Sequence, residues 1–166
     1  NKAVDNILEK LIATYPEIKA VRIGNISAIE NQEILKRTIE SICITQIKLE
    51  NGEVFESVDP LQARMGLDNS DVIAATTSSA GSLLLNNYHF DTVILDEGGQ
   101  ILDPSAIIAL IKGNRFIIVG DHLQLPPIMR TSKLQIEEKY KESLLEIGID
   151  SNRATLKSIF ERLVDY

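Results

Sequence analysis

The spacing of apolar residues changes along the chain, and this spacing distinguishes strands from helices. Two short runs at 92–95 and 116–119 are continuous, apolar and rich in β-branched residues, which is typical of parallel strands buried on both faces. Between them, Asp103-Pro104 predicts a helix start with Asp103 as the cap, and Gly113 predicts its end. This part of the chain therefore predicts a strand–helix–strand unit.

The N-terminal part shows the same alternation. Residues 18–23 and 72–75 are further short strand candidates, and a short helix is expected at 80–85 after a run of hydroxyl residues. One helical stripe precedes the first strand and comprises Val4, Ile7, Leu8, Leu11 and Ile12. A second stripe follows it and comprises Ile34, Leu35, Thr38, Ile39 and Ile42. Alternating strands and helices predict an α/β fold with three layers.

The stretch at 44–71 fits this alternation least well. Asn51-Gly52 is a hairpin-type turn signal between two strand-like segments, and Asp59-Pro60 is a helix start. We interpret residues 26–70 approximately as a variable inserted subdomain beside the core.

The C-terminal region is predicted to be helical. Residues 133–147 carry a helical pattern that Gly148 ends, and Thr155 is a candidate cap for a last helix. The apolar residues of that last helix are Leu156, Ile159, Phe160 and Leu163.

Composition narrows the class of protein. A chain of 166 residues with 44% hydrophobic content can build one domain with a core, and a net charge of -7 argues against a uniformly basic nucleic-acid coat. No apolar run has a membrane-spanning length, so no membrane association is expected. The single Cys43 fits a reducing compartment, cytoplasmic or, in a eukaryote, nuclear.

Acidic residues follow both strands of the predicted strand–helix–strand unit. Asp96-Glu97 ends the first strand, and Gly120-Asp121 ends the second. Carboxyl ends of parallel strands form the ligand-binding edge of open α/β sheets. There, one carboxylate can hold Mg²⁺ against phosphates while a second orients or deprotonates the attacking water. The competing interpretation is that Asp96 and Glu97 only cap the next helix and remain solvated.

Several segments resemble, in order, the motifs of superfamily 1 helicases. The similarity is greatest to the branch that contains the nonsense-mediated-decay RNA helicase and related DNA helicases. VILDEGGQ resembles the Walker B motif, and IIVGDHLQLPP resembles motif III. The other resembling segments are NKAVDNILEKL (the second half of motif Ia), VIAATTSSAG (the strand and loop after the branch's insertion) and SIFERL (a helix after motif III).

This resemblance implies a RecA-like, P-loop NTPase type of fold and a helicase or translocase that uses ATP and Mg²⁺. It implies that Asp96 holds the metal, that Glu97 activates water and that Gln124 senses the γ-phosphate. The other implied nucleotide-site residues are Gln100, Gly120, Asp121 and His122. The implied nucleic-acid contacts are Asn1, Thr77, Ser78 and Ser79. The implied partners are single-stranded DNA or RNA, with DNA slightly favoured, and the remaining helicase domains of a longer chain.

The sequence departs from the family pattern in one large respect. No G-x-x-x-x-G-K-[ST] segment is present, so the Walker A strand and loop are lacking. We therefore expect residues 1–166 to be part of a first RecA-like domain, from motif Ia to just past motif III, and to be inactive alone. We also expect the strand at 115–119 to have an unpaired edge that promotes self-association. A smaller departure is Gly98-Gly99, where pairs such as Ala-Ser or Ala-Gly are commoner.

Two other functions are compatible with parts of the sequence. The chain could be a non-catalytic α/β module that binds nucleotide or nucleic acid and has lost the phosphate loop. Alternatively, Asp96 and Asp121 could form a phosphoryl-acceptor pocket like that of receiver domains. The receiver interpretation ranks last, because it gives no role to the DEGGQ and QLPP segments.

Overall fold

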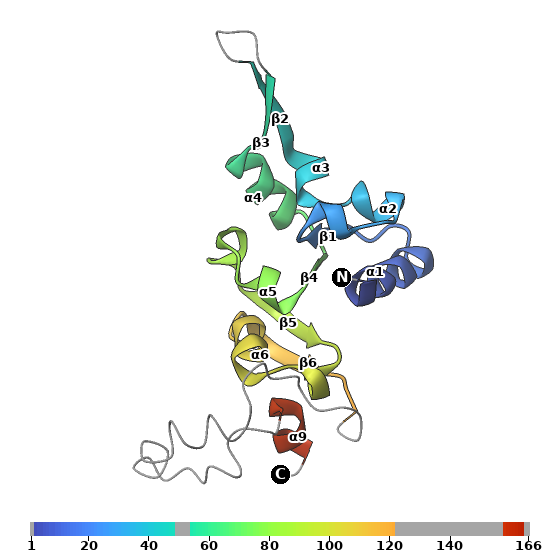
Figure 1. Cartoon of the computed structure of the whole chain (residues 1–166), viewed down its shortest axis with the longest axis vertical. Coiled ribbons are helices and arrows are strands. Elements are labelled where there is room, and N and C mark those ends of the chain that lie inside the picture. Colours follow the sequence, from blue (N-terminus) through green and yellow to red (C-terminus); the bar gives the residue numbers. More distant parts are fainter. Residues whose placement is uncertain (1, 49–53, 122–157, 165–166) are drawn as a thin grey trace. The chain divides into compact units, whose positions relative to one another are not determined.

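The computed structural model describes residues 2–48, 54–121 and 158–164, which form two compact units, Asn1–Asn87 and Tyr88–Tyr166 (Figure 1). We describe each unit by itself. Among the described residues, no helix is long and apolar enough to cross a membrane.

The first unit is built around two parallel strands. Strand β1 (Ala20–Ile23) pairs with β4 (Val72–Ala75) in a register that runs from Ala20 opposite Val72 to Ile23 opposite Ala75. Both strands predicted at 18–23 and 72–75 are thereby confirmed. The other elements are α1 (Lys2–Thr14), η1 (Ile26–Ala28), α2 (Gln32–Leu35), α3 (Ile39–Cys43), β2 (Ile44–Lys48), β3 (Val54–Val58), α4 (Pro60–Asp68), α5 (Thr77–Ala80) and η2 (Leu83–Leu85).

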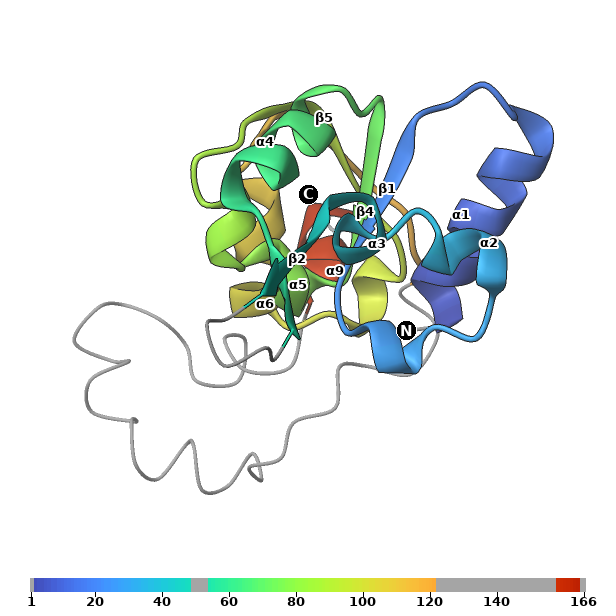
Figure 2. The ribbon, with the colours of Figure 1, turned by 90° about the horizontal axis from the view of Figure 1, so that it is seen from above.

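Helix α1 packs against α2, which lies beside it in Figure 2, and also against β4. The core residues are Leu8, Ala20, Ile29 and Ile34. Leu8 comes from the predicted stripe of α1, whose Leu11 and Ile12 are also partly buried against the core. Ile7, in contrast, is 48% exposed, so the stripe is narrower than predicted.

The second predicted helical stripe is wrong as one helix, because the chain breaks between α2 and α3. The carbonyl of Arg37 accepts a hydrogen bond from the backbone N–H of Arg22 at 2.9 Å, and Thr38 forms an isolated bridge with Arg22. Thr38 Oγ1 then accepts from the N–H of Ser41 at 3.2 Å, as a capping hydroxyl does. Pairing with β1 and local capping both compete with a continuous helix. Similarly, the helix predicted at 80–85 is two short pieces, α5 and η2.

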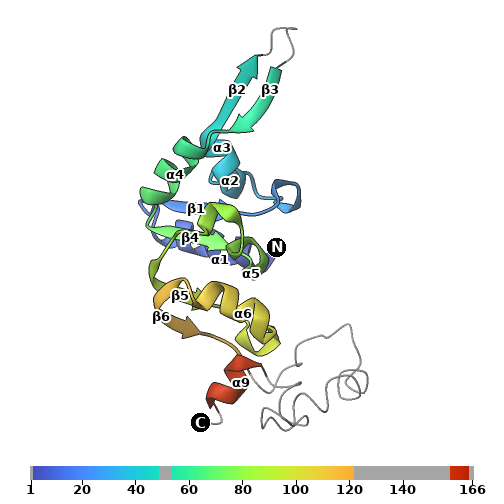
Figure 3. The same cartoon turned by 90° about the vertical axis from the view of Figure 1, so that its left-hand side faces the viewer.

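The region between the paired strands contains the predicted hairpin. Strands β2 and β3 pair antiparallel, from Ile44 opposite Val58 to Lys48 opposite Val54 (Figure 3). Asp59 caps α4 by accepting from the N–H of Leu61 at 2.8 Å, which confirms the predicted helix start. The structure shows that the hairpin and α4 lie in the sequence between the paired strands β1 and β4. That this region is an inserted subdomain remains a prediction.

The second unit contains the predicted strand–helix–strand arrangement. Strand β5 (Phe90–Leu95) pairs parallel with β6 (Gly113–Ile118), and α6 (Asp103–Leu110) connects them. The turn η3 (Gly98–Gln100) follows β5, and α9 (Ile159–Val164) packs against that turn (Figure 3). Parallel pairing joined by a helix confirms the α/β class.

Burial of these two strands was predicted wrongly. Ile94 is 68% exposed, and Phe116 and Ile117 are 54% and 51% exposed. Complete burial of a parallel pair requires covering layers on both faces. Among the described residues of this unit, α6 is the helix that packs against β5 and β6, so most of their apolar side chains remain accessible.

The helix ends in the second unit also differ from expectation. Asp103 is the first residue of α6 rather than its cap; the cap position is Leu102. Gly113 begins β6 instead of ending the helix. Ser158 caps α9, because its Oγ accepts from the N–H of Glu161 at 3.1 Å. The helix predicted at 133–147 and its end at Gly148, together with Thr155 and Leu156, lie outside the described residues.

Candidate functional site

The strongest candidate site is the turn at the carboxyl end of β5. Leu95 is the last buried side chain of the strand, at 5% exposure, whereas Asp96 and Glu97 are both exposed. Glu97 has φ 57° and ψ 37°, and among the described residues other than glycine it alone has a positive φ. A left-handed conformation in a non-glycine residue costs on the order of 1–3 kcal/mol and persists only where its surroundings enforce it.

Hydrogen bonds from both strand ends enforce this conformation. The N–H of Val119 donates to the carbonyl of Leu95, and the N–H of Gly98 donates to the carbonyl of Val119, each at 2.8 Å. Within the turn, the N–H of Gln100 donates to the carbonyl of Glu97 at 2.9 Å. The turn is thus attached to the end of β6 through main-chain groups.

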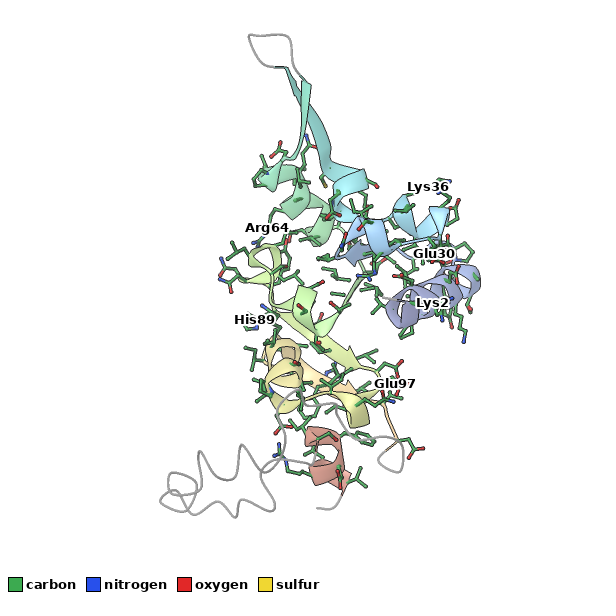
Figure 4. All side chains as sticks on the ribbon, in the orientation of Figure 1. Lys2, Glu30, Lys36, Arg64, His89 and Glu97 are labelled. Carbon is green, nitrogen blue, oxygen red and sulfur yellow. The ribbon has the colours of Figure 1, made fainter. Side chains whose placement is uncertain are left out.

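One side-chain contact orients the carboxylate itself. Nε2 of Gln100 donates to Oε2 of Glu97 at 3.3 Å, and Glu97 remains exposed on the turn (Figure 4). An exposed carboxylate with one oxygen engaged by an amide keeps its other oxygen accessible to a water molecule.

The structure brings together five of the predicted nucleotide-site residues. Asp96, Glu97 and Gln100 lie on the turn after β5, and Gly120 and Asp121 follow β6 directly beside them. The contact is close, because a Cβ added at Gly120 would lie 2.9 Å from the backbone nitrogen of Gly99. The remaining two residues predicted for the nucleotide site, His122 and Gln124, lie outside the described residues.

Helix α9 completes the surroundings of the turn. A Cβ at Gly98 would lie 3.4 Å from Cβ of Phe160, and Arg162 donates to the carboxylate of Asp103. Sequence reasoning did not assign roles to Phe160, Arg162 or Asp103 at the site. The available signal was the family order of the SIFERL segment after motif III.

The donor set of the turn fits Mg²⁺. Mg²⁺ in nucleotide sites is bound by one or two carboxylates, several waters and substrate phosphates. Asp96 and Glu97 supply exposed carboxylates of this kind. Among the described residues, no group of three or more His, Cys, Asp or Glu side chains forms a complete metal site.

The predicted nucleic-acid contacts lie in the first unit. Thr76 caps α5, since its Oγ1 accepts from the N–H of Ser79 at 3.1 Å and hydrogen bonds with the Ser79 hydroxyl at 3.0 Å. Ser79 therefore takes part in the cap of α5 through both its N–H and its hydroxyl. Ser78 is exposed and Thr77 is half-buried. Asn1 lies outside the described residues.

Parallel strands with helices between them, and acidic residues at neighbouring strand ends, define an α/β protein, a class in which ligands bind at the carboxyl ends of the strands. Residues 44–132 match the family described as an AAA domain, and this match covers more than half of the chain. The chain belongs to this family, and its resemblance to superfamily 1 helicases is confirmed.

Three relatives illustrate the similarity. An uncharacterized ATP-dependent helicase of Methanocaldococcus jannaschii is 40% identical over 48% of this chain and 12% of its own length. The DNA replication ATP-dependent helicase/nuclease DNA2 of Saccharomyces cerevisiae is 33% identical over 90% of this chain and 10% of its own length. The regulator of nonsense transcripts 1 homolog of Arabidopsis thaliana is 26% identical over 90% of this chain and 14% of its own length. The chain thus spans about a tenth of each relative.

Proposed function

We propose that this chain forms part of the ATPase motor of a longer ATP-dependent helicase or translocase that acts on nucleic acid. The observation that carries this proposal is the exposed Asp96-Glu97 turn, which main-chain hydrogen bonds hold against the end of β6. Similarity to a DNA replication ATP-dependent helicase/nuclease over 90% of the chain supports the same function.

In this proposal, the two carboxylates of the turn have different roles. Asp96 follows the buried Leu95 directly and binds Mg²⁺, which neutralises phosphate charge when it is bound. Glu97 orients or deprotonates the attacking water through the carboxylate that Gln100 contacts. Gln124 senses the γ-phosphate, and His122 and Asp121 lie beside the nucleotide.

The proposed nucleic-acid contacts are the hydroxyl groups after β4 and Asn1. Hydroxyls suit phosphate contacts, which position a strand without reading its sequence. Ser78 is the exposed hydroxyl of this group, so it is the best placed for such a contact, with Thr77 beside it. Single-stranded DNA is slightly favoured over RNA, because the relative described as a DNA replication helicase/nuclease is 33% identical, whereas the regulator of nonsense transcripts 1 homolog is 26% identical.

The decisive experiment replaces Glu97 with Gln in the full-length protein. Glu97→Gln keeps the size and the contact with Gln100 but removes the base, so ATP turnover should fall by on the order of 10²–10⁴ while nucleotide binding survives. Asp91→Asn is the matched control, because Asp91 is an exposed carboxylate on β5, the strand that leads into this turn. Wild-type turnover in Glu97→Gln would exclude the proposed role.

Two further variants separate the roles. Asp96→Asn should weaken Mg²⁺-dependent nucleotide binding itself, whereas Gln124→Ala should uncouple ATP hydrolysis from strand separation. Equal losses of nucleotide affinity in Glu97→Gln, Asp96→Asn and Gln124→Ala would contradict this division.

The 166-residue chain alone should have no measurable ATPase activity. The sequence contains no phosphate-binding loop, which supplies the backbone N–H groups and the lysine that position the β- and γ-phosphates. ATP turnover measured with and without single-stranded DNA tests this. Nucleic-acid-stimulated turnover by the purified chain that persists in Glu97→Gln would contradict it.

A further inference from the structure

A buried ion pair connects α1 to the strand ends of the first unit. Nε of Arg22 lies 2.7 Å from Oδ1 of Asp5, and the two side chains are 2% and 12% exposed. Asp5 belongs to the first turn of α1, the helix that directly follows Asn1 in the sequence. Arg22 belongs to β1, whose last residue, Ile23, pairs with the last residue of β4. The pair thus joins the start of α1 to the carboxyl ends of both strands.

The guanidinium of this pair lies close to the hydroxyl segment after β4. A Cβ built at Gly24 would lie 2.8 Å from Nη1 of Arg22 and 3.2 Å from Oγ of Ser79. The guanidinium and the Ser79 hydroxyl therefore lie on the same side of Gly24. Ser79 in turn hydrogen bonds with Thr76 through its N–H at 3.1 Å and its hydroxyl at 3.0 Å. These contacts extend from α1 to the cap of α5, the short helix that carries Ser78.

Stability alone gives little reason for a buried ion pair at this position. Taking two charges out of water costs free energy, and apolar residues of similar volume often stabilise a fold as well or better. The hydrophobic effect is non-directional, however, whereas a charge-assisted hydrogen bond has a preferred length and angle. What the pair supplies beyond packing is therefore a fixed orientation of the Arg22 guanidinium beside Gly24 and Ser79.

We propose that Asp5 and Arg22 are positioning residues for the binding of single-stranded nucleic acid. The pair sets the hydroxyl segment after β4, with its exposed Ser78, at a fixed place relative to the start of α1. Arg22 is 1% exposed, so it acts without touching a phosphate itself. This inference rests on the proposed function, because it assigns the pair a role in the nucleic-acid contact of that function.

The first test compares affinity with stability in the full-length protein. Asp5→Leu with Arg22→Met removes both charges and keeps apolar volume, so the fold is retained. Kd for a fluorescently labelled oligo-dT strand should nevertheless rise about tenfold, which corresponds to the loss of about one hydrogen bond to a charged group. Wild-type affinity in this double variant would overturn the inference.

The matched control is Glu33→Gln with Lys36→Gln. It also removes one acidic and one basic charge that lie 2.7 Å apart in the first unit, but from its surface. This control should keep the wild-type Kd for oligo-dT. A loss of affinity equal to that of Asp5→Leu with Arg22→Met would show that any such change of charge weakens binding, and would overturn the inference.

The second test uses the opposite change. Asp5→Asn keeps an Oδ1 that accepts from Nε of Arg22, but it takes the carboxylate away from a buried guanidinium. Urea denaturation should therefore show a loss of stability, while the folded protein should bind oligo-dT with the wild-type Kd. If the pair were purely structural, affinity would follow stability, and the two variants would rank in the opposite order. Weaker binding by folded Asp5→Asn than by the double variant would overturn the inference.

The salt dependence of binding separates positioning from direct contact. For single strands, each phosphate that a cation neutralises contributes about 0.7 to the slope of log K against log salt. Asp5→Leu with Arg22→Met should keep the wild-type slope, because the buried Arg22 does not touch the strand. A slope smaller by about 0.7 would mean that Arg22 binds a phosphate itself, and would overturn the inference.

ATP turnover distinguishes the inference from the proposed function. In the double variant, half-maximal stimulation should need more oligo-dT by the same factor as the rise in Kd, whereas kcat at saturating oligo-dT should be unchanged. A lower kcat at saturation would overturn the inference. A wild-type protein that binds neither a DNA nor an RNA strand would instead refute the proposed function.

Hydrogen exchange tests the contact even in that case. The N–H of Ser79 is bonded to Oγ1 of Thr76 at 3.1 Å, and the N–H of Asn69 is bonded to the carbonyl of Met65 at 3.1 Å on α4. Exchange at Ser79 should accelerate in Asp5→Leu with Arg22→Met, whereas exchange at Asn69 should not. Unchanged exchange at Ser79, or equal acceleration at both amides, would overturn the inference.

Discussion

The two units fix the ends of their parallel strands by different means. In the first unit, Nε of Arg22 lies 2.7 Å from Oδ1 of Asp5, and the two side chains are only 2% and 12% exposed. This buried ion pair connects α1 to β1. In the second unit, main-chain hydrogen bonds and three glycines connect the strand ends, and the acidic side chains remain exposed.

The two units thus differ in whether their charged side chains are buried in an ion pair or exposed to solvent. Arg22 is 1% exposed, and its guanidinium also donates to the carbonyl of Ile23. It occupies the space beside Gly24, where φ is 147° and a Cβ would lie 2.8 Å from Nη1. The charges of Asp5 and Arg22 are thereby used within the fold. At the end of β5, main-chain hydrogen bonds hold the turn, and the side chains of Asp96 and Glu97 remain exposed.

The largest effect is expected from breaking the buried pair. Arg22→Ala removes the guanidinium from a buried carboxylate, and removing one partner of such a pair costs about 3–5 kcal/mol. Urea denaturation should show this loss in the free energy of unfolding. The double variant Asp5→Leu with Arg22→Met should lose less than Arg22→Ala, because it removes both charges and keeps apolar volume. A greater loss in the double variant would show that the pair itself stabilises the unit.

An intermediate effect concerns the exposed apolar strand of the second unit. Among the described residues, β6 pairs with β5 only, and its Phe116 and Ile117 are about half exposed. An edge strand of this kind can pair with a strand of another molecule, because its backbone N–H and C=O groups lack partners. Leaving such a group buried without a hydrogen bond costs about 1–3 kcal/mol, and pairing removes this cost. The 166-residue chain should therefore self-associate through β6.

Sedimentation at increasing concentration tests this association. Ile117→Lys should shift the chain toward monomer, because a charged side chain discourages strand addition. Ile7→Lys is the control, since Ile7 is 48% exposed on α1 in the other unit. A monomer whose 116–119 amides exchange as slowly as those of 93–95, with no strand beside them, would refute the prediction.

Local signals in the sequence were sufficient for much of the fold. Asn51-Gly52 predicted the β2–β3 pairing, and Asp59 predicted the start of α4, because turn and cap preferences act over a few residues. The break at Thr38 was not predictable from periodicity, because the competing partner, Arg22, lies 16 residues earlier in the chain (38 − 22). The hydrogen bond from the N–H of Arg22 to the carbonyl of Arg37 is a tertiary contact, and the spacing of apolar residues within a helix does not indicate such contacts.

The candidate site was predictable in its residue types but not in its geometry. Acidic residues after two strands indicated where Asp96, Glu97 and Asp121 would meet, because parallel strands end at one edge. The close approach of Gly99 to the main chain of Asp121 joins segments more than twenty positions apart, and sequence spacing does not reveal such a contact. The exposure of the apolar side chains of β5 and β6 was also not predicted. A continuous apolar run indicates a strand, but it does not indicate which elements pack over that strand.

The smallest effect is expected from a surface ion pair of the same length as the buried one. Nζ of Lys36 lies 2.7 Å from Oε1 of Glu33, but the two side chains are 68% and 69% exposed. The hydrogen bond from Lys36, followed by its charge, lowers the pKa of the Glu33 carboxyl. A lowered folded-state pKa gives a contribution to stability that is present above the unfolded pKa and is lost as pH falls through the folded value.

Lys36→Ala should therefore raise the pKa of Glu33 toward its ordinary value and leave the unfolding free energy at neutral pH nearly unchanged, since solvent screens an exposed pair. Titration of the Glu33 side-chain carbon by NMR measures the first effect, and urea denaturation measures the second. Glu30→Gln is a matched control on the same surface, because Glu30 is an exposed carboxylate nearby in the sequence (Figure 4). A destabilisation by Lys36→Ala as large as that by Arg22→Ala would show that length alone, and not burial, decides what such a pair contributes.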